Sequence, residues 1–192
     1  MNTDFFVFMA APVVACLVIV SIHVWLGLHV LARGVIFVDL ALAQLAALGA
    51  ALTLVAGFEP DGVMAYIASL SAALIGAALF AVTRSARQDV PQEAIIGVVY
   101  IVAAAASIIA LDQSAHGAEH LKEALIGQIL WVDWSDVLRA LIAYVIIGAL
   151  HWRWRKPLLR VASGGDGMSV KSVRLWDFFF YATFAAVITI SV

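Results

Sequence analysis

Long apolar runs alternate with short polar connections along the whole chain. The apolar runs cover residues 5–31, 35–57, 63–84, 94–111, 136–153 and 174–192. Each is close to the roughly 20 residues with which an α-helix crosses a hydrocarbon core of about 30 Å. The pattern predicts an all-α fold, a polytopic bundle of about six transmembrane helices. The first span is long enough to require tilt.

The basic residues of the connections predict the orientation of this bundle. With six spans, 9 of the 11 Lys and Arg residues lie on one side of the membrane: Arg33, Arg84, Arg87, Arg153, Arg155, Lys156, Arg160, Lys171 and Arg174. By the positive-inside rule that side is cytoplasmic. Both termini are then expected outside, together with most of the acidic residues of the connections.

Composition supports a membrane protein and excludes several other classes. Hydrophobic residues make up 65% of the chain and charged residues only 12%, which a soluble domain of 192 residues cannot accommodate. No glycine-rich loop ending in Lys-Ser/Thr is present to bind ATP, and no Ser, His and Asp pattern indicates a hydrolase. We therefore expect neither an enzyme nor a nucleic-acid-binding protein, and the only non-protein partner that the pattern implies is membrane lipid.

The stretch HGAEH, residues 116–120, is a candidate metal site on the outer side. Neutral imidazoles suit zinc, manganese or iron, and residues four apart share one face of a helix. His116, Glu119 and His120 are therefore candidate ligands. The alternative is a solvated polar loop that caps the next segment. That segment, LKEALIGQILWV, has the pattern of an amphipathic helix at the outer interface.

Asp39 is the second candidate, because an acidic residue within or at the mouth of a span is a functional hypothesis by default. Its alternative role is that of a carboxylate at a helix start, where the macrodipole favours it. Arg33 is close enough in sequence to pair with it. The run ALAQLAALGAAL, which follows, is rich in small residues that let helices approach closely.

The remaining intramembrane histidines are expected to be structural. His23 and His29 are six residues apart in the first span, on nearly opposite faces, so each is expected to be buried and hydrogen-bonded rather than part of one site. His151, within HWRWRK, is expected at the interface beside lipid headgroups.

Three stretches together resemble the membrane subunit of ABC transporters for zinc, manganese or iron. ARGVIFVDLALAQLAALGAAL (32–52) resembles the Arg-led start of the second span of that family. PQEAIIGVVYIVAAAASIIAL (91–111) is similar to its acidic-x-Ala-Ile-Gly start of the fourth span. LIGQILWVDWSDVL (125–138) resembles the segment that leads into its fifth span. The resemblance covers about residues 25–192.

The resemblance implies a metal path in the second span, where the family has an Asp and a His four residues apart. Alignment on the histidine places Gln44 there and Leu40 at the Asp position, with Asp39 one residue away. Asp39 and Gln44 are therefore the implied pathway residues, although a neutral amide is a poor zinc ligand.

The connection LLRVASGGDGMSV is implied to supply a coupling helix to the ATPase. Its Ala-x-x-x-Gly turn falls near Ala162, Ser163, Gly164 and Gly167, but Ala162 and Gly167 are five residues apart rather than four.

The resemblance also implies partners and a location. We expect a homodimer in the bacterial cytoplasmic (inner) membrane, working with a cytoplasmic ATP-binding subunit and an extracytoplasmic metal-binding protein. The divalent metal, with zinc favoured, is cargo; this chain is expected to bind no cofactor, and ATP is used by the partner. We expect one permease domain over residues 1–192 that lacks the last spans of the family. The alternative is a truncated, non-transporting membrane scaffold or metal sensor.

Overall fold

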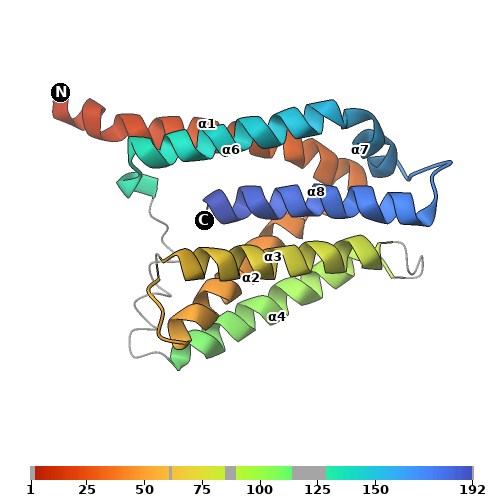
Figure 1. Cartoon of the computed structure of the whole chain (residues 1–192), viewed down its shortest axis with the longest axis horizontal. Coiled ribbons are helices and arrows are strands. Elements are labelled where there is room, and N and C mark those ends of the chain that lie inside the picture. Colours follow the sequence, from red (N-terminus) through yellow and green to blue (C-terminus); the bar gives the residue numbers. More distant parts are fainter. Residues whose placement is uncertain (1–2, 61, 85–89, 114–128, 192) are drawn as a thin grey trace.

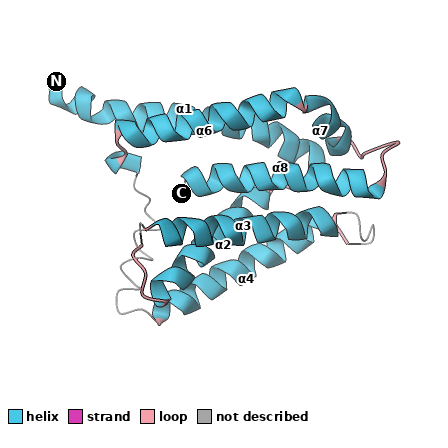
Figure 2. Cartoon of the chain, in the orientation of Figure 1, coloured by secondary structure: helices cyan, strands magenta, loops and turns pink. Residues whose placement is uncertain are grey.

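The computed structural model describes residues 3–60, 62–84, 90–113 and 129–191, and every regular element in these ranges is helical (Figure 2). Within these described ranges, six helices are long and apolar enough to cross a membrane: α1 (Thr3–Arg33), α2 (Val38–Val55), α3 (Val63–Thr83), α4 (Gln92–Asp112), α6 (Trp134–Arg153) and α8 (Val170–Ser191). The predicted spans are confirmed; the largest difference is that α8 begins at Val170 rather than at 174. Two shorter elements are the 3₁₀ turn η1 (Ile129–Trp131) and α7 (Arg155–Ala162).

The helices form two groups with α8 between them (Figure 1). In the first group α2 packs against α3 and α4, and in the second α1 packs against α6. α8 lies along α3 and also contacts α2, α6 and α7. Its buried aromatic residues Phe180, Tyr181 and Phe184 belong to the central core, which also contains Phe80 of α3 and Leu42 of α2.

The outer faces of the bundle are apolar. Only 22–44% of the residues in the most hydrophobic window of each span are buried inside the chain. Large residues such as Val63, Ile75 and Ile101 have exposed fractions of 64–77%. An apolar exterior of this kind suits lipid or other membrane helices rather than water. The chain is therefore a multi-pass membrane protein.

Small residues bring α2 and α3 together, as the alanine-rich run predicted. A Cβ atom added to Gly49 would lie 2.5 Å from the carbonyl oxygen of Ala68, so the two backbones meet there without room for a side chain. Gly76 of α3 likewise packs against the side chain of Leu45. Such close approach increases the dispersion contacts that hold helices together in a bilayer.

The two ends of the bundle differ in which connections they hold. At one end, termed the basic end, α1 and α3 finish and α7 follows α6, on the right of Figure 1. The other end, termed the opposite end, holds both chain termini, the α2–α3 connection and η1. This alternation is the one expected for six consecutive spans.

Candidate functional site

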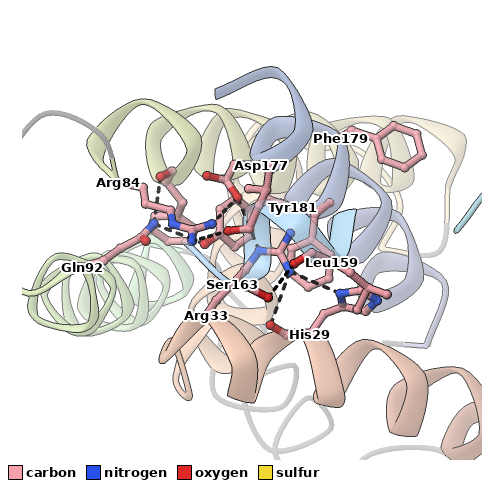
Figure 3. Close-up of polar contacts among 12 residues, drawn as sticks. His29, Arg33, Arg84, Gln92, Leu159, Ser163, Asp177, Phe179 and Tyr181 are labelled. Atoms are coloured by element: carbon pink, nitrogen blue, oxygen red, sulfur yellow. Dashed lines mark hydrogen bonds and ion pairs between the residues drawn. The ribbon is translucent and has the colours of Figure 1, made fainter. Parts of the chain in front are cut away.

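A buried ion-pair cluster joins three membrane helices at the basic end (Figure 3). Asp177 of α8 accepts hydrogen bonds at Oδ1 from Arg84 Nη1 at 2.5 Å and from Arg33 Nε at 3.4 Å. The side chains of Asp177 and Arg33 are fully buried, and that of Arg84 is 17% exposed. Charges in a low-dielectric interior need close partners, and this carboxylate has two. We call Arg33, Arg84 and Asp177 the buried cluster.

The buried cluster also reaches α7, and a neighbouring pair of hydrogen bonds involves α4. Arg84 Nη2 donates to the carbonyl oxygen of Val161, near the end of α7, at 2.8 Å. Gln92 of α4 donates from Nε2 to the carbonyl oxygen of Phe80 at 2.9 Å and to the Tyr181 hydroxyl at 3.3 Å. Polar contacts of α1, α3, α4, α7 and α8 therefore lie close together at the basic end (Figure 3).

The turn after α1 places Arg33 inside the bundle rather than at its surface. Gly34 has φ of 67°, which only glycine adopts without strain, so the chain reverses directly after Arg33. Val35 and Val38 are then fully buried. The backbone N–H of Phe37 donates to Glu93 Oε1 of α4 at 2.9 Å, which fixes the turn against a fourth helix.

His29 and His151 are buried in the core beside the cluster. His29 contacts Arg33 Nη1 through Nδ1 at 3.4 Å. His151 accepts from Trp25 Nε1 at its Nδ1 and contacts the Thr183 hydroxyl through Nε2 at 2.8 Å. Both ring nitrogens of His151 are therefore occupied, which suits a structural histidine rather than a metal ligand.

The expected interfacial position of His151 is wrong: its side chain is fully buried. The neighbouring arginines and tryptophans predicted an interfacial residue, but α6 turns this one position toward α1 and α8. The expectation of a buried, hydrogen-bonded histidine is confirmed for His29. His23 contacts the carbonyl oxygen of Ile19 through Nδ1 at 2.8 Å but is only half-buried, so its expected burial is wrong.

A cavity of about 680 Å³ lies at the opposite end, between α2, α3, α6 and α8. Its wall is made of small and polar residues: Ala46, Ala47, Ala50, Pro60, Gly62, Ala65, Tyr66, Ser69, Asp136, Arg139 and Thr189. Its charged members, Asp136 and Arg139, form an ion pair of 3.2 Å whose side chains are 51% and 79% exposed. The cavity is thus a space lined by small and polar residues, with one exposed ion pair, within a largely apolar bundle.

Asp39 lies on the face of α2 that leads from this cavity toward the basic end. Asp39, Ala43, Ala46 and Ala50 are spaced by four, three and four residues and therefore share one helix face, and Ala46 and Ala50 line the cavity. Gln44 lies about 140° around the helix from Asp39, because each residue advances by about 100°. The structure therefore places both pathway candidates on α2 but on different faces.

Arg33 does not pair with Asp39, contrary to the sequence expectation. The Gly34 turn directs the guanidinium to Asp177 of α8 instead, 144 residues away. Asp39 is half-buried and within electrostatic range of the His23 imidazole of α1.

The helix predicted between the fifth and sixth spans is present as α7, which occupies the first part of that connection. Ala162, the last residue of α7, is buried, whereas Ser163 and Gly164 are exposed. Gly164 and Gly167 have φ of 113° and 74°, so the chain turns sharply between α7 and α8. The four coupling candidates thus form the end of α7 and the turn that follows it.

His116, Glu119 and His120 lie outside the described residues, as does most of the predicted outer amphipathic segment. Among the described residues, no three or more His, Cys, Asp or Glu side chains gather in a way that would hold a metal ion. The metal-capture hypothesis therefore stays a prediction.

Comparison with known proteins identifies the family. Residues 5–192 match the model of the ABC 3 transport family. The chain belongs to this family. Its members are non-catalytic membrane subunits, the permeases of metal ABC transporters, in agreement with the sequence expectation. No curated protein matches the sequence.

A solved structure shares the fold of this ABC 3 family chain. The chain is similar to a chain of PsaBC from Streptococcus pneumoniae in complex with Fab, with a TM-score of 0.66 and 20% sequence identity. The match covers 95% of this chain and 65% of the other, so the present chain spans slightly less than two thirds of that protein. At this identity the likeness establishes the fold alone.

Sequence reasoning missed the buried cluster, although one signal for it was present. Asp177 is the only acidic residue in the run RLWDFFFYATFAAVITI, and an acid within a span marks a site with a partner. From the sequence, Arg84 indicates only orientation, and Arg33 indicates orientation and a pairing with Asp39. Nothing in their spacing along the chain indicates that both reach the same carboxylate.

Proposed function

We propose that this chain is the permease subunit of an ATP-driven importer of a divalent metal ion, with zinc favoured as cargo. It works as a homodimer with two cytoplasmic ATPase subunits and receives the metal from an extracytoplasmic binding protein. Membership of the ABC 3 transport family over residues 5–192 is the observation that carries the proposal.

The distribution of charge supports the orientation in this proposal. Of the Lys and Arg residues that the structure describes, all but Arg139 fall in or next to the connections of the basic end. The positive-inside rule then makes the basic end cytoplasmic, and the cavity and both termini face outward. On this orientation HGAEH is outside, where metal arrives.

The form of α7 supports its assignment as the surface that contacts the ATPase. Leu158, Val161 and Ala162 are buried against the bundle, while Arg155 and Arg160 lie on the same short helix. A short amphipathic helix at the cytoplasmic surface is suited to carry force from a soluble partner. Ser163, Gly164 and Gly167 complete this surface.

The outer cavity and Asp39 support a path for a cation. Water-exposed polar groups at the mouth let a metal ion keep most of its hydration shell. Asp39 then offers a carboxylate deeper along the same face of α2, and such a group is a hard ligand suited to divalent metals. Gln44 is the neutral second member of the pathway. His116, Glu119 and His120 capture the metal before it enters.

Uptake in proteoliposomes tests this function. The chain is co-purified with its ATPase, reconstituted, and supplied with ATP and radioactive zinc, manganese or iron together with the binding protein. We expect ATP-dependent accumulation of metal, and we expect zinc to accumulate faster than manganese or iron. If ATP drives no accumulation of any of them in a complex that hydrolyses ATP, the importer assignment is wrong. The scaffold or sensor alternative then takes its place.

A further inference from the structure

Arg84 is the residue that contacts both α7 and the interior of the bundle. One guanidinium nitrogen, Nη2, donates to the Val161 carbonyl oxygen at 2.8 Å, and the other, Nη1, donates to Asp177 at 2.5 Å. Figure 3 shows the Arg84 and Asp177 side chains pointing toward one another from different helices. The partners lie 77 and 93 residues from Arg84 in the sequence, so neither contact is local.

Arginine is suited to this double contact. Its planar guanidinium carries donors on two terminal nitrogens, whereas a lysine has a single ammonium nitrogen and cannot reach two separate acceptors in the same geometry. Val161 lies in the last turn of α7, and its carbonyl oxygen accepts one backbone hydrogen bond, from the Gly164 N–H at 3.2 Å. Arg84 supplies a second, charge-assisted bond to this oxygen and joins it to a buried carboxylate of α8 through one rigid group.

The covalent route from α7 to α8 is less direct. It passes through Gly164, Gly165 and Gly167, which all have positive φ. Glycines of this kind can absorb backbone rotation, so a peptide link through them transmits displacement poorly. By contrast, Asp177 lies within α8 and binds Arg33, the last residue of α1. α7 also packs directly on α8 and α1, and Arg84 adds a charged, hydrogen-bonded link from the end of α7 to the Asp177 carboxylate within α8.

We propose that Arg84 is a positioning residue that carries movement of α7 to α8 and α1, through its simultaneous bonds to the Val161 carbonyl oxygen and the Asp177 carboxylate. The proposal rests on the proposed function, since it takes α7 as the surface that the ATPase moves. Arg84 touches neither metal nor nucleotide; its role is to make ATP hydrolysis productive for transport.

The test measures ATP hydrolysis and metal uptake in the same proteoliposomes for Arg84→Lys and Arg84→Gln. The matched control is Arg33→Gln, which removes a guanidinium from the same carboxylate; the hydrogen bonds of Arg33 go to Asp177 and His29 rather than to α7. Co-purification of the ATPase and thermal stability are recorded for every variant.

Both Arg84 variants are expected to retain the ATPase and to hydrolyse ATP, but to move at least about fivefold less metal per ATP, in the range of typical coupling energies. Arg33→Gln is expected to lower thermal stability and to reduce the ratio of uptake to hydrolysis less than either Arg84 variant, because the link from α7 to α8 through Arg84 remains. Arg84→Lys distinguishes the effect of the positive charge from that of the double hydrogen bond, because it keeps the charge and removes the second donor nitrogen.

Three results overturn the proposal: an unchanged ratio in both Arg84 variants, an equal fall of the ratio in Arg33→Gln, or failure of both Arg84 variants to assemble. The last result assigns Arg84 to folding alone. Failure of the unmodified chain to bind an ATPase would instead refute the proposed function, which keeps the two claims separable.

Discussion

The two ends of the bundle each hold an arginine–aspartate contact, but in opposite surroundings. Arg84 and Asp177 meet inside the basic end, where the carboxylate is fully buried and shared with Arg33. Arg139 and Asp136 meet at the opposite end on the wall of a cavity, with both side chains at least half exposed. The same chemical pair thus joins helices in the interior at one end and lies on an exposed cavity wall at the other.

This difference follows from solvation. An exposed pair keeps most of its hydration and contributes little, whereas a buried carboxylate left without its partners keeps the full cost of desolvation. The basic end is therefore expected to be closed and resistant to rearrangement unless several contacts change together. The opposite end has room for an ion and few contacts that must break to admit it.

The largest expected effect comes from removing the shared carboxylate. Asp177→Ala leaves two guanidinium groups buried without a counter-ion, and we expect a loss of about 3–5 kcal/mol in the free energy of unfolding. Arg139→Ala breaks the exposed pair and leaves Asp136 to cap α6, and it is expected to cost about 1 kcal/mol or less. Denaturation of both variants in nanodiscs checks the difference; equal losses would remove the distinction between the two ends.

A packing change between the two ends has the next largest effect. Gly49→Ala forces a Cβ atom against the Ala68 backbone, 2.5 Å away, and we expect a cost of about 1–3 kcal/mol. Gly97→Ala is the matched control, because nothing lies within 4 Å of the added atom. It is expected to be neutral or stabilising by up to about 1 kcal/mol. Similar stability of the two variants would argue against close α2–α3 packing.

A functional effect is expected from the carboxylate between the two ends. Asp39→Asn exchanges an ionic ligand for an amide, and we expect the uptake rate at saturating metal to fall about tenfold, which corresponds to about 1.4 kcal/mol. Gln44→Ala, on another face of α2, is expected to change the rate less. If Gln44→Ala has the larger effect, the path follows the other face of the helix.

The smallest effect is expected at the outer loop. Replacing His116 and His120 together with alanine should raise the metal concentration for half-maximal uptake without lowering the maximal rate. Metal binding requires neutral imidazoles, so the difference from the unmodified chain should shrink as pH falls below about 6.5. Uptake curves at two pH values check this; identical curves for variant and unmodified chain would leave HGAEH a polar loop.

Hydropathy was sufficient to predict the helices, because a span needs only a long enough apolar run. The bounds of α3 and α6 agree with expectation to within two residues. The α7 helix and the glycine turn after it were also anticipated, since helix-forming residues give way there to glycines. These features depend on local sequence, which a single chain displays directly.

The contacts between helices were not predictable in the same way. The sequence places Arg33 near Asp39, yet Arg33 binds Asp177. The chain reverses at Gly34, and burial of Val35 and Val38 places this turn inside the bundle. His151 was expected at the interface and is buried, because α6 rotates it toward Trp25 and Thr183. Pairing across more than 100 residues depends on tertiary packing, which hydropathy does not encode.

Crosslinking to the ATPase tests the assignment of the two ends most directly. Single cysteines are placed at Ser163, in the turn after α7, and at Glu59, in the α2–α3 connection, in a chain with Cys16→Ala. Both positions are exposed. In an assembled complex that hydrolyses ATP, a thiol-specific crosslinker should join position 163 to the ATPase and leave position 59 unlinked. A crosslink from position 59, with none from position 163, would contradict the account.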